Sequence, residues 1–274
     1  MTSQESQRLY SQVDKAEDPQ ALVDHMDQLR ALDPFREVKE RNFGLLNLEP
    51  GASVLDVGCG PGDDVHELAR AVGADGRAVG VDRSETMISE AGRRFGGPGL
   101  PVEFHVMDAA NLDFPNGTFD GVRADRVLQH VEDPAEILRE MIRVTRSGGT
   151  IAVSDTDWGM AAMDLSDRET TRTLVALIFD RGIRSPWIGR QLWRLFREAG
   201  LLDIQVVPHA IVMPSSGPPP AVAGRLPERI REAVSEGLVS EDRAASWQAE
   251  FDERRNADAL FMAIGMFTVA GRKP

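Results

Sequence analysis

The residues at 53–62, SVLDVGCGPG, join a short apolar run that ends in an acid, Asp56, to three glycines at alternate positions. Glycine permits backbone conformations that a Cβ disfavours, and it lets a ligand lie against the main chain. Two carboxylates, Asp63 and Asp64, then open a helical pattern. A strand, a tight turn and a helix in this order indicate a nucleotide cradle, and the acidic start of the helix favours a cationic ligand over a pyrophosphate. The alternative is an ordinary turn of an α/β domain.

A second acidic strand end follows the glycine turn. The apolar run at 78–81 ends in Asp82, twenty residues after Gly62, and Ser84 is a suitable N-cap for a helix predicted over 85–95. An acid at the end of the second strand of a nucleotide-binding fold can accept hydrogen bonds from both ribose hydroxyls. Asp82 is therefore a candidate ribose ligand, with a surface aspartate at a strand end as the alternative.

The pattern from Asp56 to Gly62 resembles motif I of the class I S-adenosylmethionine (SAM) dependent methyltransferases, (D/E)xGxGxG. The resemblance implies that the glycine turn carries the methionine portion of SAM, that Asp82 binds its ribose, and that an aspartate after the third strand takes the exocyclic amine of adenine. The cofactor-binding residues that it implies are Asp56, Gly58, Cys59, Gly60, Asp82, Arg83, Met87, Asp108, Ala109 and Ala124.

Later segments extend the resemblance over residues 50–155. Phe119 and Asp120 open the fourth predicted strand as in motif IV of that family, and the sequence RSGGT at 146–150 is similar to the family's opening of strand five. The fold class that the resemblance implies is α/β, a Rossmann-like class I methyltransferase fold. Its sheet is expected to be seven-stranded and mostly parallel, with helices on both faces.

The segment after strand four holds the catalytic candidates, because ligands of open α/β sheets bind at the carboxyl ends of the strands. His130 has the intrinsic pKa of a general base near neutral pH, and it resembles the histidine of an LxHV segment in methyltransferases of quinones and similar small molecules. The alternative is a histidine that only holds its loop. Arg126 is a candidate for stabilising a phenolate or binding an acidic substrate, with a structural ion pair as the alternative.

No metal is predicted. Asp155 and Asp157 lie one residue apart after strand five and are compatible with magnesium and a catechol substrate, but no further oxygen ligands can be identified in the sequence. The single cysteine, Cys59, and the five histidines show no zinc-ligand spacing, and one cysteine cannot form an internal disulfide.

Two regions flank or interrupt the predicted cofactor domain. Residues 1–49 have helical periodicity and are expected to form an N-terminal helical lid or to pack outside the domain; residues 50–274 form the SAM-binding domain, with cap insertions at about 156–186 and 214–258. Helices are predicted over 168–181, 187–199, 221–236 and 240–256, strands over 151–154, 204–207 and 261–270, and a stiff loop over 214–220. The apolar residues of the first insertion are expected to pack within the cap or to line a pocket for a ring system: Trp158, Met160, Met163, Phe179 and Trp187.

Composition narrows the partners. The chain has 274 residues and a net charge of −13, which opposes nonspecific attraction to nucleic acid and to anionic membranes. The apolar run at 259–270 is too short to span a bilayer, and the first five residues do not resemble a signal peptide, so a cytoplasmic location is expected. The expected partner is a small-molecule acceptor. A homo-oligomer is compatible with the sequence, which does not fix the oligomeric state.

These observations predict SAM-dependent methyl transfer to oxygen or carbon of a small acceptor, an aromatic, quinone-like or polyketide-type metabolite similar to those of ubiquinone and menaquinone biosynthesis and of secondary metabolism. One alternative is a SAM-fold protein without methyl transfer, which uses the pocket for a cyclisation or for binding. A second is an NAD-dependent oxidoreductase, since Asp82 would serve either ribose. The GxGxG spacing and the acidic start of the following helix weigh against it.

Overall fold

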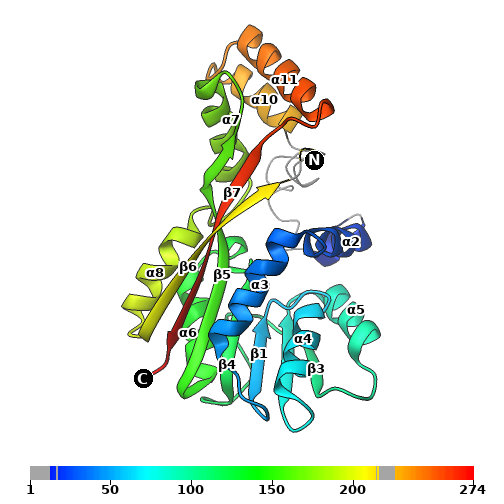
Figure 1. Ribbon diagram of the computed structural model, residues 1–274, viewed down its shortest axis with the longest axis vertical. Helices are drawn as coiled ribbons and strands as arrows, with labels where there is room; N and C mark the ends of the chain where they lie inside the picture. The colour runs from blue at the N-terminus through cyan, green and yellow to red at the C-terminus, as the bar shows by residue number, and fades with distance from the viewer. Residues whose placement is uncertain (1–12, 17, 214, 216–225) are drawn as a thin grey trace.

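A seven-stranded sheet with the strand order β3-β2-β1-β4-β5-β7-β6 runs through the molecule (Figure 1). The computed structural model describes residues 13–16, 18–213, 215 and 226–274. The first five strands in this order are parallel, and β7 pairs antiparallel with both β5 and β6. The strands are β1 (Ser53–Val57), β2 (Arg77–Asp82), β3 (Val102–Val106), β4 (Phe119–Asp125), β5 (Thr145–Met163), β6 (Leu202–Met213) and β7 (Met262–Arg272). The predicted fold class is confirmed.

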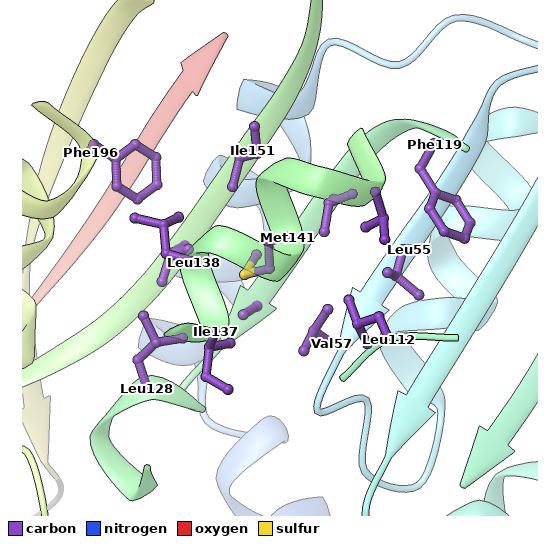
Figure 2. Packing of buried hydrophobic residues seen from close by; sticks show 14 of the residues in the cluster. Leu55, Val57, Leu112, Phe119, Leu128, Ile137, Leu138, Met141, Ile151 and Phe196 are labelled. Atoms are coloured by element: carbon purple, nitrogen blue, oxygen red, sulfur yellow. The ribbon is translucent and has the colours of Figure 1, made fainter. Parts of the chain in front are cut away.

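Side chains alternate between the two faces of the sheet, and each face is covered by its own helices. On β1, Leu55 and Val57 belong to the core that α6 and α8 cover, whereas Val54 belongs to the core beneath α3 and α4. Figure 2 shows the first of these cores, in which the side chain of Met141 from α6 lies among the other buried apolar side chains of the cluster. The helices are η1 (Val13–Lys15), α2 (Pro19–Arg30), α3 (Asp33–Leu46), α4 (Asp63–Val72), α5 (Glu85–Phe95), η2 (Leu128–His130), α6 (Pro134–Val144), α7 (Arg168–Asp180), α8 (Ile188–Glu198), α10 (Leu226–Ser235) and α11 (Glu241–Asn256).

Strand β5 is far longer than the predicted 151–154, and this prediction is wrong at both ends. Its second half continues beyond the parallel sheet as a partner of β7, with Asp157 opposite Gly265 and Ala162 opposite Ala263. Gly265 has no Cβ, and one built there would lie 2.7 Å from Cβ of Met160, so the close approach of the two strands requires glycine. The sequence around Trp158-Gly159 lacks the alternation that identifies a strand. This segment forms a strand because it pairs with β7, which is distant in sequence.

The extended ribbon of β5, β6 and β7 carries a cap of α7, α10 and α11 at one end of the molecule (Figure 1). The cap has a core of its own around Trp247, whose indole N–H donates to Oγ1 of Thr171 at 2.8 Å. Trp158 and Phe179 stack within it at 4.3 Å between ring centroids, whereas Met160 and Trp187 are about half exposed. Strand β6 extends beyond the predicted strand 204–207 at both ends. The predicted helix 221–236 corresponds to α10, which is described from Leu226. The predicted loop at 214–220 lies, except for residue 215, outside the described residues.

Two N-terminal helices lie on the α4 side of the sheet; α2 lies near the carboxyl ends of the strands, and α3 runs from there along the sheet toward the strands' amino ends (Figure 1). Asp18 caps α2 by accepting a hydrogen bond from the amide of Ala21, and Pro19 occupies the first helical position, where its missing N–H costs nothing. Phe35 and Val38 of α3 pack into the core of the cap. Helix α3 therefore contacts both the parallel sheet and the cap.

Candidate functional site

The glycine turn between β1 and α4 has a backbone that only glycine adopts easily. Gly58, Gly60 and Gly62 have φ values of 71°, 53° and 87°. The amides of Gly58 and Cys59 both donate to the carbonyl of Val81, at 2.8 and 3.0 Å, which fixes the turn against β2. The turn therefore presents bare main chain at the carboxyl edge of the sheet, as a cradle for a ligand requires.

Neighbouring side chains lie directly on that bare main chain. A Cβ built on Gly58 would lie 2.4 Å from Cγ2 of Val127, and one on Gly60 would lie 2.9 Å from Cε of Met26. Met26 belongs to α2 and packs beside Met87, Val13 and Val23. A ligand that lies against Gly60 must consequently displace the end of the Met26 side chain.

Asp82 holds the glycine turn and the start of α5 together. One carboxylate oxygen accepts from the amide of Gly60 and the other from the amide of Ser84, each at 3.0 Å. Burial raises the pKa of Asp82, and these two amides oppose the rise. Asp14 of η1 accepts from Oγ of Ser84 at 2.7 Å and from the first amides of α5, so the N-terminal segment is anchored beside Asp82.

A cavity opens at this edge of the sheet between the glycine turn, the end of β4 and the N-terminal helices. It brings together four of the residues implied by the sequence, Asp56, Gly58, Cys59 and Arg126. It also contains Asp63 and Asp64, the acidic helix start noted in the sequence. The cavity lining includes further residues that the sequence did not suggest: Met26, Asp27, Arg30, Lys39, Pro61, Arg123 and Asp125. Most of these additions come from α2 and α3, so the cavity is formed jointly by the glycine turn and the N-terminal helices.

A buried ion network forms the floor of the cavity. Arg123, whose side chain is completely buried, donates from Nη1 to Asp56 at 2.9 Å and to Asp64 at 3.0 Å. Lys39 of α3 pairs with Asp64 and, at 3.0 Å, with Asp125. Arg30 also lies 3.9 Å from Asp64, and Arg126 lies 3.8 Å from Asp125, so each of the three carboxylates has at least one cation within 4 Å.

The carboxylates of this network differ in proton affinity. Burial raises the pKa of Asp56 to about 7 despite the Arg123 guanidinium. Burial also acts on Asp64, but Lys39 and Arg123 hold its pKa well below the usual range, and Asp125 is likewise lowered by Lys39. Asp56 is therefore the member of the network that takes up a proton near neutral pH, and burial is the main cause.

The two carboxylates that open α4 line the cavity but already have cationic partners. Asp63 pairs with Arg30 at 2.8 Å and with Arg94 at 3.2 Å, and Asp64 belongs to the buried network. The expectation that both are available to a cationic ligand is wrong, because residues distant in sequence neutralise them.

Arg126 follows β4 with a left-handed backbone, φ 57°, which is strained for a residue with a Cβ. Its guanidinium carbon lies 5.1 Å from the ring centroid of Phe35 on α3. Its Nε lies 3.8 Å from Oδ1 of Asp125, a distance too long for a hydrogen bond. Nε of Arg126 is buried and, within the described ranges, has no hydrogen-bond partner. The structural ion pair considered from the sequence is thus present, with Asp125, but it includes no hydrogen bond from Nε, and the guanidinium retains this donor at the cavity.

His130 ends the η2 turn one turn beyond Arg126 and does not belong to the lining of the cavity. Asp155, completely buried, holds this turn by accepting from the amide of Gln129 at 3.2 Å. The indole N–H of Trp158 donates to the Gln129 side chain at 2.6 Å. The η2 turn is thus fixed from strand β5.

The remaining predicted cofactor residues are not among those that line this cavity. Met87 is buried on α5 and Ala124 within β4, whereas Arg83, directly after β2, is exposed. Asp108 is exposed after β3 and accepts from the amide of Ala110 at 3.0 Å, and Ala109 packs against the core beneath α6.

Asp155 and Asp157 are both engaged by protein donors. Arg190 binds Asp157 through two nitrogens, one of them at 2.7 Å, and Asp155 accepts main-chain amides. Among the described residues, no group of three or more potential ligand side chains is arranged to hold a metal ion. In the same part of the chain, no helix combines the length and apolarity needed to cross a membrane.

Sheet order, glycine turn and acidic strand ends together define a Rossmann-like α/β protein. Residues 48–200 match the family described as "Methyltransferase domain". The chain belongs to this family, and it is a SAM-dependent methyltransferase with SAM as its cofactor.

Relatives cover most of the chain. A protein of Streptomyces fradiae, named an uncharacterized 37.1 kDa protein in transposon TN4556, is 36% identical over 251 residues, covering 91% of this chain and 71% of that protein. A demethylmenaquinone methyltransferase of Bacillus cytotoxicus is 28% identical over 223 residues, 76% of this chain and 93% of the relative. A crystal structure from Bacillus halodurans has a TM-score of 0.62 at 18% identity, covering 86% of this chain and 98% of the other, which shows the shared fold.

The sequence held one signal for the buried network. Arg123 stands within an apolar strand, and a buried charge there requires partners. The identity of those partners was not visible, because Lys39 lies on a helix of the N-terminal region.

Proposed function

We propose that the enzyme transfers the methyl group of SAM to an oxygen or carbon nucleophile of a small acceptor that carries negative charge as it reacts, such as a phenol, an enol or a quinone-type ring. The observation that carries this proposal is the guanidinium of Arg126 in the cavity beside the glycine turn, whose buried Nε has no hydrogen-bond acceptor among the described residues. Such a donor stabilises a developing oxyanion. The demethylmenaquinone methyltransferases among the relatives support an acceptor with a ring.

The cofactor is proposed to lie along the glycine turn, with its ribose at Asp82 and its adenine between Arg83, Met87 and Asp108. The three left-handed glycines, the Asp82 carboxylate and the neighbouring cavity support this placement. Bound SAM supplies an electrophilic methyl group on a sulfonium. The task of the chain is then to align the acceptor with that group and to exclude water.

Helices α2 and α3 are proposed to act as the lid. Met26 covers Gly60, and Phe35 covers the Arg126 guanidinium, so both helices place apolar groups over the proposed reaction site. His130 is proposed to accept the proton that an acidic acceptor loses. The anchoring of its turn by Asp155 supports a fixed position for this base.

The proposal is tested with methyl-deuterated SAM, purified enzyme and a panel of phenols, enols and reduced quinones, followed by mass spectrometry. The matched variants are Arg126→Gly, which removes the guanidinium where the left-handed backbone suits glycine, and Asn47→Gly, which makes the same change to glycine at an exposed residue that is also left-handed, φ 49°, and lies outside the cavity lining.

We expect label transfer to an acidic acceptor by the wild type. Arg126→Gly should lower kcat/KM for that acceptor by about 100-fold, the typical loss of one oxyanion donor, with SAM affinity unchanged. Label on a neutral amine alone, or full turnover by Arg126→Gly, would refute the proposal.

A further inference from the structure

Buried polar atoms without hydrogen-bond partners concentrate at the cavity. In the described part of the chain they occur in six residues, and four of the six line the cavity: Arg30, Arg123, Asp125 and Arg126. Nη1 of Arg30 still lies 2.8 Å from a carboxylate oxygen of Asp63, so three residues at the cavity are left with an unsatisfied buried atom. A buried polar group without a partner costs free energy. The grouping of these three therefore indicates a polar ligand rather than three independent defects.

Two of these residues are matched in chemistry and adjacent in space. Nη2 of Arg123 is a donor without an acceptor, and Oδ1 of Asp125 is an acceptor without a donor. The other oxygen of Asp125 lies 3.6 Å from Nη2 of Arg123, and the two side chains are only 0% and 6% exposed. A ligand with an anionic acceptor and a cationic donor a few bonds apart would satisfy both atoms and match the charge of each.

We infer that Arg123 and Asp125 recognise the α-amino-acid end of the cofactor, with Arg123 binding its carboxylate and Asp125 its ammonium group. The inference rests on the proposed placement of SAM along the glycine turn. Both residues and the turn line one cavity, and the free atoms of the pair are complementary to an amino-acid zwitterion.

Within the described residues, the protein contacts of the pair leave these two atoms without a hydrogen bond; Nε of Arg126 lies 3.8 Å from Oδ1 of Asp125, beyond hydrogen-bond distance. Nη1 of Arg123 is used by Asp56 and Asp64, and Nε donates to Asn42 at 2.9 Å. Lys39 binds Oδ2 of Asp125 at 3.0 Å. The pair is thus oriented in advance by its other bonds, which lowers the cost of ordering on ligand binding.

The test compares calorimetric affinities of two ligands. S-adenosylhomocysteine carries the amino-acid end, whereas 5′-methylthioadenosine shares the adenosine and thioether and lacks that end. The variants are Arg123→Lys, which keeps the positive charge beside Asp56 and Asp64 but removes the guanidinium fork, and Asp125→Asn. Arg77→Lys is the matched control, since Arg77 forms a two-point pair with Glu103 at the start of β2. Thermal unfolding checks that each variant folds.

We expect Arg123→Lys and Asp125→Asn each to lower the affinity for S-adenosylhomocysteine by about tenfold or more, the effect of losing a hydrogen bond between charged groups. Their affinity for 5′-methylthioadenosine should not change, and Arg77→Lys should bind both ligands like the wild type. The decarboxylated analogue of S-adenosylhomocysteine separates the two contacts. Its affinity should already be reduced in the wild type and should fall no further in Arg123→Lys.

Unchanged S-adenosylhomocysteine affinity in the variants, or an equal loss for both ligands, would overturn the assignment of Arg123 and Asp125. If Arg123→Lys keeps its affinity for S-adenosylhomocysteine but has a raised KM for an acidic acceptor, the Arg123 guanidinium binds the anion of the acceptor instead. Failure of the wild type to bind either ligand would overturn the proposed site as a whole, which keeps the two failures distinct.

Discussion

Asp155→Asn should make the stability of the protein less dependent on pH. Asp155 is completely buried, and burial raises its pKa to about 7, although main-chain amides of Gln129 and Thr156 donate to it. Asp125 adds to the rise. Because the native state holds this proton more tightly than the unfolded chain, the associated stability is present at low pH and is lost as pH rises from about 4 through 7. Asn cannot titrate, and its side-chain oxygen can still accept an amide.

The magnitude follows from the shift. With a native pKa of about 7 and an unfolded value of 3.8, Asp155 accounts for a loss of about 2–3 kcal/mol between pH 5 and pH 8. Urea unfolding of wild type and Asp155→Asn across this range measures it. The difference in the free energy of unfolding, variant minus wild type, should rise by that amount between pH 5 and pH 8. Asp56, which titrates in the same window, is present in both proteins and cancels.

The exposed-carboxylate variant Asp113→Asn serves as the control and should show no such trend. A constant difference between wild type and Asp155→Asn at all pH values would show that Asp155 stays ionised in the folded protein. The argument from its burial would then be refuted.

Three further predictions concern the cofactor, the proposed base and the ion network. Asp82→Ala should weaken S-adenosylhomocysteine binding at least ~tenfold in a calorimetric titration, and unchanged affinity would remove Asp82 as ribose ligand. His130→Ala should lower kcat with cofactor affinity unchanged, whereas His105→Ala, at an exposed site on β3, should not; wild-type turnover would exclude His130 as base. Lys39→Met leaves Asp64 and Asp125 short of a cation and should cost about 3 kcal/mol in chemical unfolding, while a loss below the error of the measurement would contradict the network.

The first half of the site could be predicted because its signals are local. The turn around Gly58 and Gly60 needs glycine for its φ values, and Asp82 is recognisable by its place at a strand end. Both are short-range consequences of backbone geometry. The two N-terminal helices were likewise visible in the periodicity of their apolar residues.

The second half could not be predicted because it depends on long-range pairing. Arg123 reaches Asp56 and Asp64, each about sixty residues away in sequence, and Lys39 comes from a helix outside the family's matched region. The length of β5 has the same cause, since its second half is a strand only because β7 pairs with it. Local propensity carries no record of either partner.

The two N-terminal helices differ in how firmly they are held, and this decides which one must move when a ligand enters. Helix α2 places Met26 on Gly60, and its main ion pairs, Arg94 with Asp27 and Arg30 with Asp63, are partly exposed and worth at most about 1 kcal/mol each. Helix α3 is held by the buried Lys39 contacts and by packing against sheet and cap.

Displacing α2 therefore costs far less than displacing α3, and we expect α2 to open and close over the site while α3 stays in place. Hydrogen exchange measured by mass spectrometry should show fast exchange in peptides of α2 without ligand and clear protection with S-adenosylhomocysteine, and little change in α3. Equal protection of both helices would mean that they move as one body, and the buried Lys39 contacts would then not distinguish them.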